Sequence, residues 1–236
     1  MPCVVTIDGP AGAGKSTVAR LLAARLDWRF LDTGAMYRAV TLAALRSGIS
    51  LIDEAELEGL MRGIRVGLPP GAVLLDGHDV TREIRGVEVT EASKFIADSP
   101  AVRRVLMDWQ RDFAREQDVV TEGRDQGTLV FPHAYRKYYL TASDEERARR
   151  RLADYRARGH GEGVSFESVL REIRERDARD AGRAIAPMKP AFDAVVIDST
   201  GMSIAAVLSL LADDIVQQID PQRTGTPAGD PAEVSS

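Results

Sequence analysis

Short apolar segments alternate with longer amphipathic segments along most of this chain. One apolar run begins at Val4, and similar runs lie at residues 28–31, 119–121, 138–140 and 194–197. Such runs are typical of strands that are buried on both faces of a parallel sheet. Apolar residues at a spacing of three to four predict helices over residues 16–26, about 33–46, from 100, after 143, from 165 and over 203–219. This alternation predicts an α/β fold: a five-stranded parallel sheet flanked by helices.

Residues 48–90 break this pattern. Apolar residues alternate at Ile64, Val66 and Leu68, prolines and a glycine follow at 69–71, and residues 73–75 form a second apolar run. Asp76-Gly77 is a hairpin signal. We therefore expect a small antiparallel β insert within the α/β fold, and it carries no evident chemistry of its own.

Arginines crowd the helix predicted after residue 143, and a glycine-rich loop follows at residues 159–163. The arginines are Arg147, Arg149, Arg150, Arg151, Arg156 and Arg158. An arginine-dense helical hairpin with a glycine-rich tip is typical of a mobile lid over phosphates. A solvated pair of charged helices would have the same composition, so both interpretations stay open on this pattern.

These segments predict one domain over residues 1–219 and a disordered tail at 220–236. The core comprises residues 1–47, 91–145 and 184–219, the β insert about 48–90, and the helical lid about 146–183. The tail consists largely of Pro, Gly, Thr and Ser with no apolar pattern, which is why we expect it to be disordered.

A glycine-rich segment joins the first predicted strand to the first helix. Gly9, Gly14, Lys15 and Ser16 fit the phosphate-binding loop pattern G-x-x-x-x-G-K-[ST], or P-loop. Glycines let backbone N–H groups approach phosphate oxygens, and the following helix adds a positive dipole end. Lys15 supplies a point charge for the outer phosphates, and the Ser16 hydroxyl suits Mg²⁺. The sequence therefore predicts a nucleoside-triphosphate site at the end of the first strand.

Composition narrows the classes of partner. The net charge of −5 provides no overall basic field for nucleic acid or an anionic membrane, although arginines outnumber lysines 27 to 4. The single cysteine, Cys3, allows no intrachain disulfide, and no apolar run approaches the length of a membrane helix. We expect a cytoplasmic protein that binds neither nucleic acid nor membrane, and nothing in the sequence requires more than a monomer.

Polar clusters follow two of the predicted strands, and a third cluster lies on a predicted helix. Residues 32–38 form a strand-to-helix turn that ends in Arg38, and residues 122–128 follow another buried strand, where ligands bind in open α/β sheets. Arg176, Asp180 and Arg183 share one helix face, which a ladder of surface ion pairs would also explain. Arg103 lies off the apolar stripe of its helix, so it is either solvated or directed into a cleft.

A P-loop on the first strand makes an NTP-driven protein or a phosphotransferase the leading class. A GTPase switch would need a guanine-reading N-K-x-D segment, which the sequence lacks. A small-molecule kinase needs a second phosphate site and a lid, which Arg38, Arg124 and the lid arginines could supply. A kinase for another acceptor and a non-catalytic NTP-binding module remain as alternatives.

Residues 9–17, 32–38, 79–85, 122–128, the lid segment and 176–187 together resemble the bacterial cytidylate kinases, in order and in spacing. The resemblance runs from about residue 4 to residue 219. It implies the P-loop fold of nucleoside monophosphate kinases, and transfer of phosphate from ATP to CMP or dCMP with Mg²⁺. Thr33 stands where relatives have serine, and Gln126 occupies a position that is often apolar.

The resemblance also implies roles for individual residues. ATP would be held by Gly9, Pro10, Ala11, Gly12, Ala13, Gly14, Lys15, Ser16 and Thr17, with Ser16 toward Mg²⁺. CMP would be held by Thr33, Arg38, Ser93, Arg103, Arg124, Asp125, Arg176, Asp180 and Arg183. Among these, the residues acting on the reaction would be Lys15, Arg124, Asp125 and Arg183.

Elementary chemistry agrees with a cytosine pocket at these positions. Cytosine presents an N4–H₂ donor where uracil presents the O4 acceptor. A carboxylate such as Asp125 accepts from N4 and faces O4 unfavourably, whereas Arg103 can donate to N3 or O2. The acceptor phosphate is itself the nucleophile, so we assign no general base and expect alignment and charge neutralisation to provide the catalysis.

Overall fold

A five-stranded parallel sheet forms the centre of the computed structural model, which describes residues 2–157, 159, 163–183 and 185–218. The strand order is β2 (Arg29–Asp32), β6 (Val119–Gly123), β1 (Val4–Asp8), β7 (Arg136–Thr141) and β8 (Val195–Asp198). Every neighbouring pair is parallel, with Ile7 in register with both Glu122 and Tyr138. The predicted sheet is confirmed, and its carboxyl edge carries the P-loop and the polar turn after β6.

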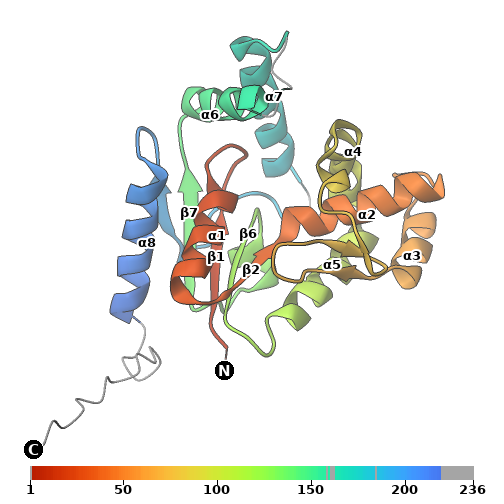
Figure 1. The fold of residues 1–236 in the computed structure, drawn as a ribbon, viewed down its shortest axis with the longest axis horizontal. Coiled ribbons are helices and arrows are strands. Elements are labelled where there is room, and N and C mark those ends of the chain that lie inside the picture. The colour runs from red at the N-terminus through yellow and green to blue at the C-terminus, as the bar shows by residue number, and fades with distance from the viewer. Residues whose placement is uncertain (1, 158, 160–162, 184, 219–236) are drawn as a thin grey trace, which may run out of the picture.

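Helices cover both faces of this sheet (Figure 1). On one face, α1 (Lys15–Leu26) and α8 (Ile204–Gln218) pack together through residues such as Leu22 and Leu211, which are fully buried. On the other face, α2 (Thr33–Ser47) and α5 (Pro100–Phe113) form the larger core cluster. Each fully buried leucine contributes about 1.5–3 kcal/mol to folding, so these layers hold the strand ends firmly in place.

The insert contains the predicted antiparallel sheet and two helices that the sequence pattern did not reveal. Its strands are β3 (Val66–Gly67), β4 (Leu74–Leu75) and β5 (His78–Asp79). Its helices are α3 (Glu54–Gly63) before the sheet and α4 (Val87–Asp98) after it, with a short 3₁₀ turn at Glu83–Arg85. Helix α4 runs past residue 90, where we expected the insert to end, and it leads directly into α5.

The arginine-rich hairpin consists of α6 (Asp144–Ala157) and α7 (Phe166–Ala181), which lie together at one end of the molecule (Figure 1). The two helices share a small core of their own: Ala148, Leu152, Val169 and Ile173. Ser143 accepts a hydrogen bond from the N–H of Glu146 at 3.2 Å, which caps the start of α6. Arg158, most of the glycine-rich tip and the tail at 220–236 lie outside the described residues.

The described helices are too short or too polar for a membrane span.

Candidate active site

The loop between β1 and α1 has the backbone shape that phosphate binding requires. Gly9, Gly12 and Gly14 all have positive φ angles, of 142°, 78° and 89°. A Cβ at Gly9 would lie 2.0 Å from the carbonyl oxygen of Leu140, so only glycine fits there. Gly14 is the N-cap of α1 and provides no side-chain cap, which leaves the first N–H groups of the helix free to bind an anion.

Lys15 lies within this loop and is almost wholly buried. Its Nζ donates to the carbonyl oxygen of Pro10 at 2.7 Å. Burial lowers the pKa of Lys15 to about 7; nearby Arg124 adds to this shift and Glu122 opposes it. The lysine is therefore a cation with too little counter-charge, and an anionic ligand would stabilise its protonated form.

Ser16 is joined to the next strand by a hydrogen bond that the sequence did not indicate. Its Oγ donates to Oε1 of Glu122, at the end of β6, at 3.0 Å. Within the described ranges, no three His, Cys, Asp or Glu side chains gather closely enough to form a metal site of their own. Mg²⁺ is usually bound by one or two protein oxygens together with substrate phosphates and water. The Ser16 hydroxyl beside the Glu122 carboxylate is a donor set of this kind.

A cavity of about 390 Å³ opens beside the P-loop, between α2, α4, the turn after β6 and α7. This volume suits a small ligand. All nine residues that the resemblance assigns to the acceptor nucleotide line it: Thr33, Arg38, Ser93, Arg103, Arg124, Asp125, Arg176, Asp180 and Arg183. The fold thus brings residues from five separate segments to one cavity.

Asp180 is the central counter-charge of this cavity. It accepts a hydrogen bond from Nε of Arg124 at 3.1 Å, forms an ion pair with Arg183 at 2.9 Å, and lies 4.0 Å from Arg176. Burial opposes the ionisation of Asp180, but Arg124, Arg183 and Arg176 outweigh it and hold its pKa below the ordinary value. The side chain is only 4% exposed, which excludes a ladder of surface ion pairs.

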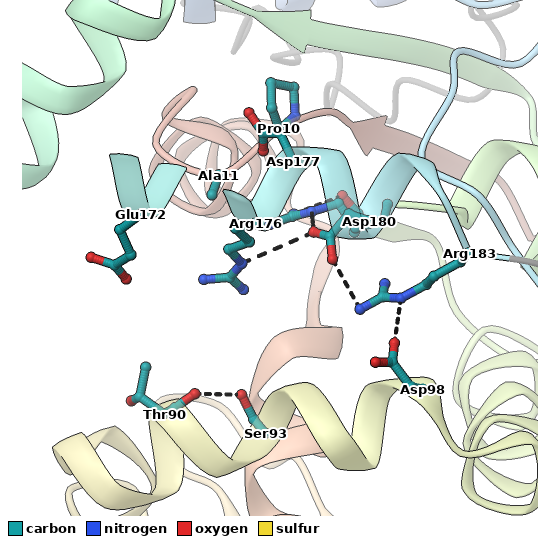
Figure 2. A network of polar contacts seen from close by, with 12 residues as sticks. Pro10, Ala11, Thr90, Ser93, Asp98, Glu172, Arg176, Asp177, Asp180 and Arg183 are labelled. Carbon is teal, nitrogen blue, oxygen red and sulfur yellow. Dashed lines mark hydrogen bonds and ion pairs between the residues drawn. The ribbon is translucent and has the colours of Figure 1, made fainter. Parts of the chain in front are cut away.

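Figure 2 shows how this cluster reaches the opposite wall of the cavity. Arg183, after the end of α7, donates through Nε to Asp98 at the end of α4, at 2.7 Å. Ser93 lies on the same helix as Asp98 and faces Arg176 across the open space (Figure 2). Helix α4 and the end of α7 are therefore linked through Arg183, and Asp98 is a contributor that the sequence pattern did not reveal.

Arg103 and Asp125 form an ion pair in the depth of the cavity, with side chains 10% and 11% exposed. Burial raises the pKa of Asp125, although Arg103 opposes the shift. Arg103 also donates to the carbonyl oxygen of Ala97 at 3.0 Å, and its guanidinium lies over the ring of Tyr37. The sequence left open whether Arg103 is solvated or directed into a cleft, and in the structure it is directed into the cavity.

Arg38 is a partly buried cation whose partners are incomplete. Its nearest carboxylate is Asp32 at 3.7 Å, and among the described residues its Nε has no hydrogen-bond partner although it is buried. Asp32 is itself engaged, because it caps α2 by accepting from the N–H of Ala35 at 2.8 Å. A buried guanidinium N–H without a partner is costly, and an anion in the cavity would satisfy it.

The two hydroxyl residues that the resemblance assigns to CMP already donate their hydrogens to the backbone. Thr33 donates to the carbonyl oxygen of Glu122, and Ser93 donates to that of Thr90, both at 2.7 Å. Both residues line the cavity, and a hydroxyl that donates its hydrogen still has lone pairs that can accept. Toward a ligand these residues are therefore hydrogen-bond acceptors.

The lid arginines have different partners. Arg147 is buried and donates to the P-loop carbonyl of Ala11 at 3.0 Å and to Asp177 on α7. Arg150 donates to the oxygens of Ser199 at 3.0 and 2.7 Å, and Arg149 is exposed beside Glu146. Of the α6 arginines only Arg151 lines the cavity. The hairpin is thus tied to the P-loop through one buried arginine, a contact that no sequence pattern marked.

Comparison with known proteins agrees with this geometry. The family model described as "Cytidylate kinase" matches residues 5–218. A cytidylate kinase of Desulforamulus reducens is 51% identical over 208 residues, which cover 87% of this chain and 93% of the relative. The cytidylate kinase of Stutzerimonas stutzeri is 45% identical, with 91% of this chain and 96% of the relative covered.

The chain belongs to the cytidylate kinase family. It is therefore a kinase of the P-loop fold that phosphorylates a nucleoside monophosphate. Among solved structures, an uncharacterized protein from Eubacterium ventriosum has the same fold, with a TM-score of 0.53, 11% identity, and 91% and 98% of the two chains covered. The cavity beside the P-loop has a cationic lining and a volume that suits a small anionic ligand.

Proposed function

We propose that this enzyme transfers the γ-phosphoryl group of ATP to CMP and dCMP, with Mg²⁺, to give ADP with CDP or dCDP. One observation carries the proposal: the buried P-loop lysine lies within electrostatic reach of two arginines that line the cavity, Arg124 and Arg176. Two cationic sites that share a boundary suit two phosphorylated ligands that meet there.

The donor side of the proposal uses residues 9–17. The loop N–H groups and the start of α1 bind the β- and γ-phosphates of ATP, and Lys15 neutralises the charge that the leaving group acquires. Ser16, held by Glu122, lies where Mg²⁺ would be bound on the phosphates. When bound, Mg²⁺ would add positive charge at the transferring group.

On the acceptor side, we assign the phosphate of CMP to Arg38 and Arg124, and the sugar to Arg176 and Asp180. The buried Nε of Arg38 has no protein partner among the described residues, which supports its assignment to an anion. We assign the base to Arg103 and Asp125, with Thr33 and Ser93 as further hydrogen-bond acceptors for it. Arg183, held between Asp180 and Asp98, completes the acceptor site.

The mechanism requires little covalent work from the protein. The acceptor phosphate is ionised near pH 7 and attacks the γ-phosphorus in line as the bond to ADP breaks. Catalysis then comes from alignment of the two nucleotides and from cations around the transferring group. We propose that α6 and α7 close over this group as a lid and that residues 48–90 form the acceptor-binding insert. Closure would exclude water, which would otherwise hydrolyse ATP.

A panel of acceptors tests the proposal. The enzyme is given ATP–Mg²⁺ with CMP, dCMP, UMP, AMP or shikimate separately, and kcat/KM is measured from ADP release. We expect CMP and dCMP to exceed UMP by at least about tenfold, because Asp125 faces O4 of uracil unfavourably. A preference for AMP or shikimate would overturn the proposed substrate, and ATP hydrolysis independent of any acceptor would favour an NTP-binding module.

The pKa of Lys15 gives a second prediction, for the binding of ATP–Mg²⁺ without acceptor. Burial lowers this pKa to about 7 in the free protein, and a bound triphosphate raises it again. At pH 8 the free lysine is about nine-tenths neutral, so binding takes up about one proton. ATP affinity then falls by up to about tenfold per pH unit above pH 7.

Calorimetric titration at pH 8 in two buffers of different ionisation enthalpy measures this proton directly. The apparent binding enthalpies should differ by about one buffer ionisation enthalpy. Equal enthalpies in both buffers would show that Lys15 is already protonated in the free protein.

A further inference from the structure

Two buried glutamine side chains lie behind the Arg103–Asp125 pair. Gln110 on α5 and Gln126 in the turn after β6 are each 1% exposed. Nε2 of Gln126 donates to Oε1 of Gln110 at 3.0 Å, and the Thr121 hydroxyl donates to Oε1 of Gln126 at 3.0 Å. Both ends of the Gln126 amide are therefore satisfied inside the core, which fixes its orientation.

These amides connect the two elements that carry the base-reading residues. Gln110 lies on the buried face of α5, two helical turns after Arg103. Gln126 is the residue next to Asp125 and begins the π-helical turn Gln126–Val130. Helix α5 and this turn are thus joined by the Arg103–Asp125 ion pair and by the Gln110–Gln126 amide pair.

Two further contacts hold the same turn. Arg111, next to Gln110, donates to the carbonyl oxygens of Val130 and Leu129 at 2.9 and 3.0 Å. From the sheet, the buried carboxylate of Asp8 accepts from the N–H groups of Gln126 and Gly127 at 2.9 and 2.7 Å. These bonds attach the backbone of the turn to α5 and to β1, and none of them involves the side chain of Asp125.

The backbone beside the turn leaves room for the amide. A Cβ at Gly123 would lie 2.7 Å from Cγ of Gln126, so the glutamine side chain occupies the space that a side chain at residue 123 would need. Gln110, Gln126 and Thr121 lie outside the cavity lining, and none of them can contact a ligand there.

We propose that Gln110 and Gln126 are positioning residues that hold Asp125 against Arg103 and thereby set the base selectivity of the cavity. The proposal rests on the proposed function, in which Arg103 and Asp125 read the base. An ion pair alone permits sliding, because a guanidinium accepts a carboxylate in several arrangements. The amide pair adds a second fixed point, which selects the arrangement that leaves a carboxylate oxygen for N4 of cytosine.

Near-isosteric methionine substitutions test this role. In each of the variants Gln126→Met and Gln110→Met, the remaining glutamine amide loses its hydrogen-bond partner in the core. We expect each single variant to lower the CMP to UMP ratio of kcat/KM by about tenfold, since small misplacements of a reading group are costly. We also expect Tm to fall by about 2–8 °C.

The double variant Gln110→Met/Gln126→Met separates positioning from stability. It removes both buried amides, so Tm should recover at least half of its loss, while the selectivity ratio stays low because the side chains at residues 110 and 126 no longer share a hydrogen bond. Gln117→Met is the matched control, because Gln117 makes two hydrogen bonds away from the cavity, to Phe113 and Arg29, and its loss should leave the ratio unchanged.

Selectivity that recovers together with Tm in the double variant would overturn the proposal, because the pair would then only fill space. An unchanged ratio in both single variants would overturn it as well. Failure of the proposed function would be visible earlier, in the unmodified enzyme, as equal kcat/KM for CMP and UMP.

Discussion

Replacement of Lys15 by alanine should lower kcat for CMP phosphorylation by about 10²- to 10³-fold, or about 3–4 kcal/mol of transition-state stabilisation. The lysine is the buried cation of the P-loop, and its Nζ lies 2.7 Å from the carbonyl oxygen of Pro10. Its positive charge becomes most useful when negative charge develops between the β- and γ-phosphates. The variant should remain folded, because the free protein gains little from a buried ammonium group whose pKa is lowered to about 7.

Steady-state kinetics and thermal unfolding check this expectation together. Lys189→Ala is the matched control, since Lys189 is exposed and does not line the cavity. It should leave both kcat and Tm near the values of the unmodified enzyme. Near-normal turnover by Lys15→Ala would contradict the donor-site assignment, and a large loss of Tm would show that Lys15 is needed for folding.

Replacement of Asp125 by alanine should lower kcat/KM for CMP by about 10²-fold or more, and that for UMP by at most about tenfold. In the proposed site the carboxylate accepts from N4 of cytosine, and uracil would gain nothing from it. The buried Arg103 then loses its partner, which costs about 3 kcal/mol of folding free energy. Measurements must therefore be made well below the lowered Tm.

The variant Asp125→Asn separates base reading from charge balance. An amide can present either its oxygen to cytosine N4 or its NH₂ group to uracil O4. The CMP to UMP ratio should therefore fall mainly because UMP is better tolerated. Asp112→Ala, which breaks the exposed Asp112–Arg115 pair on α5, is the control and should leave the ratio unchanged. An equal loss for CMP and UMP in Asp125→Ala would assign Asp125 to charge balance alone.

The strands and the main helices could be predicted because their apolar positions are dense and regular. Residues 119–121 are buried on both faces, and α8 buries Val207, Leu211 and Ile215 at helical spacing. Helix α4 gave no such signal: only Val89 and Ile96 are buried, while Val87 and Phe95 are exposed. A helix held by two buried residues and neighbouring packing has too weak a period to be recognised.

Motifs could predict which residues line the cavity, but they could not predict the contacts among those residues. Periodicity could not say whether Arg103 faces solvent, because its carboxylate partner lies 22 residues further along the chain, in a turn. The links from Asp98 to Arg183 and from Gln110 to Gln126 were invisible for the same reason. Pairs formed by tertiary structure leave no local spacing to detect, so their discovery required the fold.

The most direct test of phosphoryl transfer between two nucleotides is the product stoichiometry of the unmodified enzyme. ATP–Mg²⁺ and CMP are incubated with the protein, and the nucleotides are separated by ion-exchange chromatography at several times. We predict one CDP for each ADP, and ADP formation that nearly stops when CMP is omitted. ADP without CDP would contradict transfer to CMP, whatever the cavity binds.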